Sequence, residues 1–326
     1  MRIDAHQHFW NYDSERFDWI NDDMAALRRN FLPEDLYPIL QNSQIDGCIA
    51  VQAEEHLRET DFLLELSETY PWILGVVGWV EMAQDNLDEL LDTWSSNSKL
   101  LGFREVLQSK EPEYMLRKEF IRGIHKLGQR GYTYDLLTYP QQLPAALQLV
   151  DACPNQFFVI DHLSKPDIKA GDWKAWKKSL QPFSERELVY AKVSGLVTEA
   201  DWKKWSPADL FPYLEITLEL FGPKRLLFGS DWPVCLVAGQ YKEVLGVIES
   251  FADQLSVHEK EALFGGTAQE FYKILVEKFP FEPTTSQDLL LTKLADFIFD
   301  KNKNGLFLMK GYAGTGKTTT ISTVVN

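Results

Sequence analysis

The sequence predicts an α/β protein built as a (β/α)8 TIM barrel, with a short C-terminal extension. Short apolar runs rich in β-branched residues recur through the first 235 of the 326 residues, and stretches with helical periodicity separate them. Strands that alternate with helices pair in parallel, and eight of them close a barrel in about 250 residues. The alternative is an open doubly wound sheet, which carries a glycine-rich loop after its first strand. This chain instead has a long aromatic connection over residues 9–32, which favours the barrel.

The candidate strands share an apolar, β-branched composition and are bounded by residues that favour turns. In chain order they span residues 2–8, 47–53, 73–80, 100–107, 132–138, 157–164, 188–196 and 225–233.

The candidate helices have apolar residues at three- and four-residue spacing, and several end at Gly or are followed by Pro, which are stop signals. They include residues 33–43, 58–70, 86–96, 115–131 and 207–222. A further helical stretch over residues 257–275 is expected to complete the barrel at about residue 276.

A change of composition after residue 276 predicts a domain boundary. Residues 277–287 have the Pro- and Thr-rich composition of a linker, and a helix-like and a strand-like stretch follow them. We therefore expect a catalytic barrel domain over residues 1–276. Residues 277–326 are expected to form a linker and the truncated opening of a second domain.

The overall composition is that of a globular protein with a large core, with 45% hydrophobic and 25% charged residues. The net charge of −15 repels nucleic acid and anionic membranes, so we expect the barrel to bind neither. The sequence has no apolar run of about 18 residues, which a membrane-spanning helix needs.

The cysteines and the N-terminus favour a cytoplasmic protein. Cys48, Cys153 and Cys235 are odd in number and far apart, which argues against a disulfide framework. The first ten residues, MRIDAHQHFW, lack the basic region and apolar run of a signal peptide.

Polar residues gather at the expected carboxyl ends of three strands, where barrel enzymes place their active sites. His6 and His8 end the first strand, His162 follows the sixth and Asp231 the eighth. Side chains alternate along a strand, so the two histidines of the first strand share one face and can converge on one cation. Singly, each residue has a structural alternative, as a hydrogen-bonded core histidine or a helix N-cap. Their joint occurrence at three strand ends favours a site.

The segments DAHQHFW, GFREVLQ, YDLLTYPQQLP, IDHLSKP, KVSGL and LLFGSDWPVC occur in this order along residues 1–276. They resemble the sugar-lactonase family related to the amidohydrolases, typified by L-fuconolactonase. The resemblance implies a TIM barrel that hydrolyses aldonolactones, and it matches His6, His8, His162 and Asp231 to the family's site. It also matches Arg104 to the arginine of a Gly-x-Arg-His stretch.

The chain departs from this stretch at Glu105, which stands where many relatives have histidine. Strand alternation lets only one of Arg104 and Glu105 face inward unless the strand bulges. We favour Arg104 inside, because a cation suits a lactone carbonyl or a carboxylate product. Glu105 then lies behind the barrel wall, for instance in an ion pair, and the alternative is a metal ligand.

Lactone hydrolysis needs an activated water and a stabilised oxyanion. We expect Asp231 to act as general base, and also as a metal ligand. His162 is expected to donate to the oxyanion or the leaving oxygen, and Arg104 to reinforce it. A divalent ion, with zinc favoured over manganese, would bind His6 and His8 and activate the water. In the alternative, a metal-free site, the histidines serve only as donors.

Three tryptophans follow strand ends and are candidates for stacking on a sugar ring, namely Trp10, Trp79 and Trp232. The alternative for each is packing at the mouth of the barrel.

The C-terminal extension contains GYAGTGKTTT, in which Gly311, Gly316, Lys317 and Thr318 have the spacing of a nucleotide-binding P-loop. With the segment before it, this loop resembles the start of a superfamily-one DNA helicase. A working NTPase also needs an acidic residue from a second strand to hold its metal, and no such strand follows before Asn326. We therefore expect the loop to be inactive.

The leading functional hypothesis is thus a lactone hydrolase. Its rivals are a decarboxylase or C–C hydrolase of the amidohydrolase superfamily, which would use the same ligands, and a nucleotide-binding helicase fragment.

Overall fold

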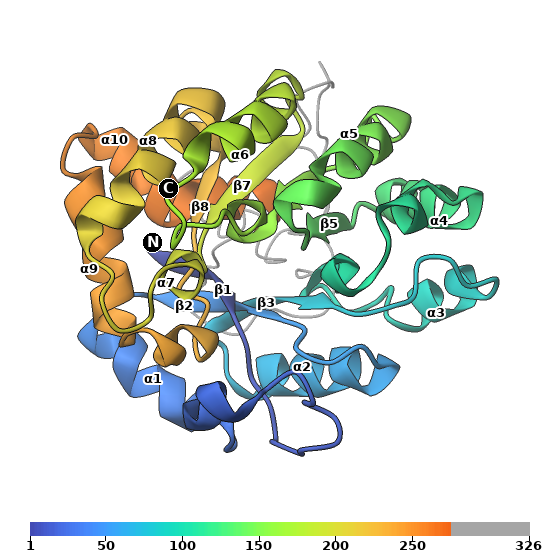
Figure 1. Cartoon of the computed structure of the whole chain (residues 1–326). Helices are drawn as coiled ribbons and strands as arrows, with labels where there is room; N and C mark the ends of the chain where they lie inside the picture. Colours follow the sequence, from blue (N-terminus) through green and yellow to red (C-terminus); the bar gives the residue numbers. More distant parts are fainter. Residues whose placement is uncertain (275–326) are drawn as a thin grey trace, which may run out of the picture. The chain divides into compact units, whose positions relative to one another are not determined.

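A computed structural model describes residues 1–274, and its central feature is a barrel of eight parallel strands wrapped by helices (Figure 1). Each strand pairs with the next along the chain, in the order β1 to β8. This confirms the predicted number, order and direction of the strands. Their bounds are β1 Ile3–Gln7, β2 Gly47–Val51, β3 Ile73–Gly78, β4 Leu100–Glu105, β5 Thr133–Leu136, β6 Phe158–Ile160, β7 Val189–Val193 and β8 Leu226–Phe228.

The seam between β1 and β8 is closed by residues just beyond β8. Gln7 and Trp232 form a parallel bridge, and the amide of His8 donates to the carbonyl of Trp232 at 2.7 Å. The amide of Asp231 donates to the carbonyl of His6 at 2.9 Å. The first and last strands of the barrel are therefore joined at their carboxyl ends.

The helices form the outer layer because each turns an apolar stripe toward the strands. In α4, for example, Phe120, Ile124 and Leu127 recur at helical spacing and are fully buried. Burying such a side chain contributes about 1.5–3 kcal/mol. The helices are α1 Pro33–Asn42, α2 Leu57–Thr69, α3 Leu87–Thr93, α4 Lys118–Arg130, α5 Leu143–Ala152, α6 Trp173–Leu180, α7 Leu196–Glu199, α8 Pro207–Phe221, α9 Tyr241–Ala252, α10 Val257–Glu261 and α11 Thr267–Phe271.

All eight strands end before their predicted bounds, two of them by four or five residues, and one expected helix is interrupted. The strands expected over 157–164 and 225–233 stop at Ile160 and Phe228, because left-handed backbone begins soon after each of them. The helix expected over 257–275 is divided by a π-helical turn at Ala262–Gly266.

Residues 1–268 form one compact unit, and the barrel lies within it. The expected linker and P-loop, with Gly311, Gly316, Lys317 and Thr318, lie outside the described residues.

Candidate active site

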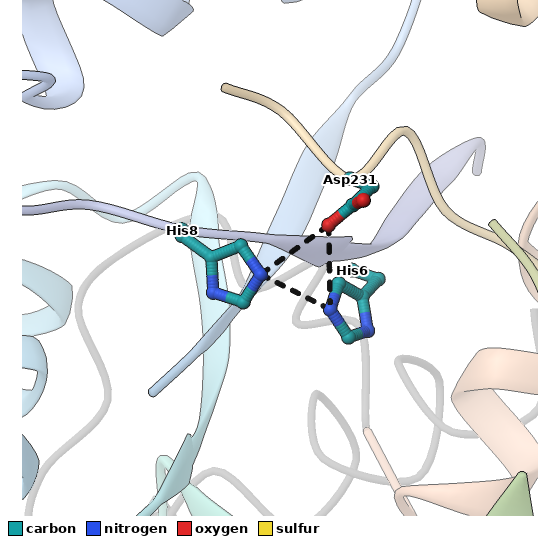
Figure 2. A group of neighbouring side chains, drawn as sticks. All are labelled: His6, His8 and Asp231. Atoms are coloured by element: carbon teal, nitrogen blue, oxygen red, sulfur yellow. Dashed lines mark hydrogen bonds and ion pairs between the residues drawn. The ribbon is translucent and has the colours of Figure 1, made fainter. Parts of the chain in front are cut away.

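His6 in β1 and His8 just after it lie on the same side of the chain, at the carboxyl end of the strand. The pairing register with β2 shifts between Asp4 and Gln7. His6 and His8 bring their Nε2 atoms within 3.2 Å of each other, as Figure 2 shows. The structure thus brings together the two imidazoles that the H-x-H spacing places on one face.

Asp231 lies beside these rings because it belongs to the segment after β8 that is hydrogen-bonded to the end of β1. Its Oδ1 atom lies 3.4 Å from Nε2 of His8 and 3.9 Å from Nε2 of His6 (Figure 2). Nε2 of His162 is 3.8 Å from the same oxygen. Burial alone raises the pKa of Asp231, but the surrounding imidazoles hold it well below its usual range. Asp231 is therefore ionised at neutral pH.

His162 lies in a left-handed turn, η5 (Asp161–Ser164), that begins where β6 ends. Four successive residues from His162 have positive φ angles, a conformation that costs non-glycine residues roughly 1–2 kcal/mol each. Tertiary contacts hold the turn in place, among them a 2.7 Å hydrogen bond from the indole of Trp176 to the carbonyl of Leu163. The turn points His162 at Asp231, which a continued strand would not do.

Residues just after β7 contact the His162 ring and hold it in position. Nδ1 of His162 is 2.9 Å from the hydroxyl of Ser194. Gly195 follows with φ of +63°, and a Cβ atom there would lie 2.5 Å from that same Nδ1. Burial lowers the pKa of His162 to about 4, against the opposing effect of Asp231 and Asp161, so the ring is neutral at pH 7.

Arg104 faces the barrel interior, as expected, and its donors are directed at protein atoms. The guanidinium donates to Asp161 Oδ2 at 2.9 Å and to the side-chain oxygen of Gln52 at 2.8 Å, and one nitrogen lies 3.3 Å from Nε2 of His6. It also donates to the backbone carbonyl of Gln52 at 2.5 Å. This geometry differs from the expected role at an oxyanion, because the N–H groups hold Asp161 and Gln52 in place beside His6.

Glu105 points to the other side of β4, so the structure places it outside the ligand group. Its carboxylate accepts hydrogen bonds from the amide of Met82 at 2.6 Å and from the hydroxyl of Tyr114 at 3.0 Å. The ion pair suggested for it is replaced by these neutral donors. Burial raises its pKa to about 7.

A buried charged network lies next to His6, and sequence reasoning missed it. Lys192 of β7 pairs with Asp135 of β5, and its Nζ atom lies 3.1 Å from Asp161 Oδ1 and 3.1 Å from His6 Nδ1. All four side chains are inaccessible to solvent. The available signal was a single charged residue inside each of two predicted strands, since such charges are rarely buried unless paired.

The donor atoms of His6, His8 and Asp231 suit a divalent cation. The Nδ1 atom of His8 lies 2.8 Å from the carbonyl of Val51, which can only accept, so Nδ1 is the donor and Nε2 is the atom that faces His6 and Asp231. Burial lowers the pKa of His6 well below its ordinary value, although Asp161 opposes this, so His6 is neutral. One ligand atom from each of the three residues lies within 4.8 Å of the others. Two imidazoles and a carboxylate are ligands that zinc favours.

Two of the three candidate stacking tryptophans are buried instead. Trp10 and Trp232 are each 1% exposed, and both pack edge-to-face against Phe31, at ring-centroid distances of 5.4 and 5.3 Å. Neither presents a ring face to a sugar, so packing is what the structure shows for them. Trp79 is half-buried just after β3 and keeps the candidate role.

None of the helices within residues 1–274 is long and apolar enough to cross a membrane.

The fold and this cluster define a class of protein, a TIM-barrel enzyme with a histidine–aspartate centre at the carboxyl ends of its strands. The model of the Amidohydrolase family matches residues 3–274, and the chain belongs to this family.

Two curated relatives are similar over most of their length. An L-fucono-1,5-lactonase of Burkholderia multivorans is 38% identical, with 84% of this chain and 96% of the relative aligned. An L-fucono-1,5-lactonase of Burkholderia ambifaria is 32% identical with the same coverage. Among solved structures, a zinc-bound amidohydrolase from Burkholderia multivorans superposes with a TM-score of 0.82 at 38% identity, covering 84% of this chain and 99% of that one.

Proposed function

We propose that this chain is a lactonase that hydrolyses a sugar lactone, an aldonolactone such as L-fuconolactone, to its open-chain acid. The observation that carries the proposal is the convergence of His6, His8, His162 and Asp231 at the barrel mouth. The two L-fucono-1,5-lactonase relatives support this reaction over decarboxylation or C–C bond hydrolysis.

His6, His8 and Asp231 would hold one divalent ion, with zinc favoured by the imidazole ligands and by the zinc-bound relative. When bound, such an ion lowers the pKa of a water molecule and polarises a carbonyl oxygen. The ionised carboxylate of Asp231 is placed to take the proton of the attacking water as general base.

The leaving oxygen needs a proton donor on the other side of the carbonyl. A Ser194 hydroxyl that donates to Nδ1, 2.9 Å away, would leave the single proton of the neutral His162 ring on Nε2, the atom that faces Asp231. His162 can then donate to the oxyanion and to the ring oxygen as the C–O bond breaks. Arg104 acts through Asp161 and His6 as a positioning residue, and Trp79 is the remaining candidate for contact with the sugar ring.

Residues 1–276 would form the catalytic domain, and residues 277–326 a linker followed by a helicase-like segment with a P-loop. The three cysteines are free thiols buried in the fold, in line with a cytoplasmic enzyme. A small sugar lactone is the expected partner, and nucleic acid is not.

The test is a pH-indicator assay of purified full-length protein against a panel of aldonolactones, with and without chelator. We expect acid release from at least one lactone, and loss of both activity and stoichiometric metal in His6→Ala. Full activity of metal-free protein in chelator would refute the metal centre, and no turnover of any aldonolactone would refute the lactonase.

A further inference from the structure

Four buried side-chain nitrogens within residues 1–274 have no hydrogen-bond partner, and all four follow three neighbouring strands of the barrel. Nε2 of Gln52 comes just after β2, Nε1 of Trp79 and Nε2 of Gln84 after β3, and Nε2 of Gln108 after β4. Amide and indole nitrogens donate hydrogen bonds and do not accept them. Buried donors in proteins are usually paired, so this group at the carboxyl ends of β2 to β4 indicates a partner outside the chain.

Gln52 lies beside the proposed metal ligands. Its side chain is fully buried, and its amide oxygen accepts a hydrogen bond from the guanidinium of Arg104 at 2.8 Å. Another nitrogen of Arg104 lies 3.3 Å from Nε2 of His6. Because a guanidinium can only donate, the amide oxygen of Gln52 must be the atom that faces Arg104. The amide nitrogen is therefore turned away from the guanidinium, and its N–H groups lack a partner among residues 1–274.

Trp79 holds the second donor, at the neighbouring strand end. The backbone amide of Gln52 donates to the carbonyl of Val77 at 2.8 Å, and Trp79 is only two residues further along the chain. Thr60 fixes the backbone of Trp79, because its hydroxyl donates to the Trp79 carbonyl and accepts from the Trp79 amide, both at 2.9 Å. The indole N–H is then the remaining donor of this residue, and the residue is half-buried just after β3.

We propose that Gln52 and Trp79 determine substrate specificity by donating hydrogen bonds to hydroxyl oxygens of the sugar lactone. This inference rests on the proposed lactonase function. Each hydroxyl oxygen of an aldonolactone offers lone pairs that match an N–H donor. Protein atoms cover both nitrogens in this structure, so the lactone must displace side chains to reach them. A lactone without hydroxyls leaves both donors unpaired, so the site should stabilise its transition state less well.

The test compares L-fucono-1,5-lactone with δ-hexanolactone, which has the same ring and methyl group but no hydroxyls. Gln52→Met and Trp79→Phe remove the donors and keep a side chain of similar length or an aromatic ring. Each should lower kcat/KM for the sugar lactone roughly 3–10-fold, the effect of one lost neutral hydrogen bond. For δ-hexanolactone the change should stay within about twofold, so the ratio of the two kcat/KM values falls.

The same ratio distinguishes loss of a donor from a disturbance of Arg104. In Gln52→Met the guanidinium loses its bond to the side chain at position 52. It keeps its bonds to Asp161 at 2.9 Å and to the backbone carbonyl of residue 52 at 2.5 Å. A shift of Arg104 would act near the carbonyl that both lactones share. It would therefore lower both kcat/KM values and leave their ratio unchanged.

Gln156→Met and Trp173→Phe are the matched controls. Gln156 is a buried glutamine before β6, and its amide donates to the backbone carbonyls of Tyr132 and Phe157 at 2.9 Å. Trp173 begins α6 and is exposed. Neither control should change the ratio. An unchanged ratio in a folded test variant, or an equal change in its control, would overturn the proposal.

Binding provides a second measurement that does not depend on turnover. Isothermal titration calorimetry compares L-fuconate, the expected product, with hexanoate, which has the same carbon chain and no hydroxyls. We expect the wild type to prefer L-fuconate, and each test variant to lose roughly 3–10-fold of that preference. If the wild type hydrolyses neither lactone, the lactonase proposal fails, and equal affinities for the two acids would then overturn the role of the donors as well. If thermal melts show that one variant is unfolded, the other decides.

Discussion

At the scale of single residues, Asp231 has the most demanding role, since it is both a ligand candidate and the proposed base. Asp231→Asn keeps the size of the side chain and removes its ability to accept a proton. We expect kcat for the lactone to fall by at least ~10², the usual contribution of general-base catalysis. Steady-state assays with a circular dichroism check of folding measure this.

Asp253→Asn is the control for this change, because Asp253 pairs with Lys260 at an exposed position. It should leave kcat within about twofold of the wild type, as surface substitutions commonly do. A folded Asp231→Asn enzyme with near-normal turnover would exclude Asp231 as the base.

The raised pKa of Glu105 should affect the pH dependence of protein stability and not catalysis. Its pKa is raised from 4.5 to about 7 by burial, so the folded state binds this proton more tightly than the unfolded state does. The stabilising effect of the proton is fully present below about pH 4.5 and is lost as pH rises through 7. Glu105→Gln, which stays neutral, should therefore gain stability over the wild type as pH rises from 5 to 8, by at most about 3 kcal/mol.

Urea unfolding at several pH values tests this, since the difference between variant and wild type isolates Glu105. Glu119→Gln, at an exposed position of α4, is the matched control and should follow the wild-type curve. A constant difference between Glu105→Gln and wild type across this pH range would contradict the buried, neutral glutamic acid.

At the scale of elements, the position of the His162 ring depends on Gly195, a glycine with left-handed backbone after β7. Gly195→Ala adds a methyl group 2.5 Å from His162 Nδ1 at a φ of +63°, so it should displace the ring and lower kcat at least tenfold. Gly171→Ala is the matched control: φ there is +72°, but a Cβ atom meets nothing within 4 Å.

Both variants should lose about 1 kcal/mol of stability from backbone strain. Only Gly195→Ala should lose activity, and equal activities would show that the contact with His162 is unimportant.

The elements also show where sequence reasoning works and where it stops. Strand order and helix faces were predictable because period-two and helical patterns are local properties of the chain. Alternation allowed only one of Arg104 and Glu105 to face inward, and the chemistry expected of the site favoured Arg104. The left-handed turn at His162 was not predictable, because tertiary contacts and not local preference hold it. Nor were the partners of Lys192, since they come from strands far apart in sequence.

The burial of Trp10 and Trp232 was also not predictable from the sequence. Like Trp79, both follow the end of a strand, but their burial depends on the packing of the connection over residues 9–32. Phe31 from that connection covers both rings.

At the scale of the whole molecule, catalysis should be confined to the barrel domain. We expect deletion of residues 280–326 to leave lactone turnover unchanged, because every proposed site residue lies upstream. We also expect the full chain to hydrolyse ATP no faster than Lys317→Ala, its matched control in the P-loop. Turnover and phosphate release are measured on the same preparations, and a magnesium-dependent ATPase rate lost in Lys317→Ala would overturn the assignment.

The seam between β1 and β8 has a consequence for how the enzyme is made. Its hydrogen bonds join His6 to Asp231 and His8 to Trp232, so the two halves of the proposed centre come from opposite ends of the barrel sequence. Almost the whole domain must therefore emerge from the ribosome before the centre can form. A nascent chain stalled earlier should have no lactonase activity. Contacts between such distant segments are costly to form early in folding. The onset of lactone turnover during translation would thus report when β1 pairs with the segment after β8 and closes the barrel.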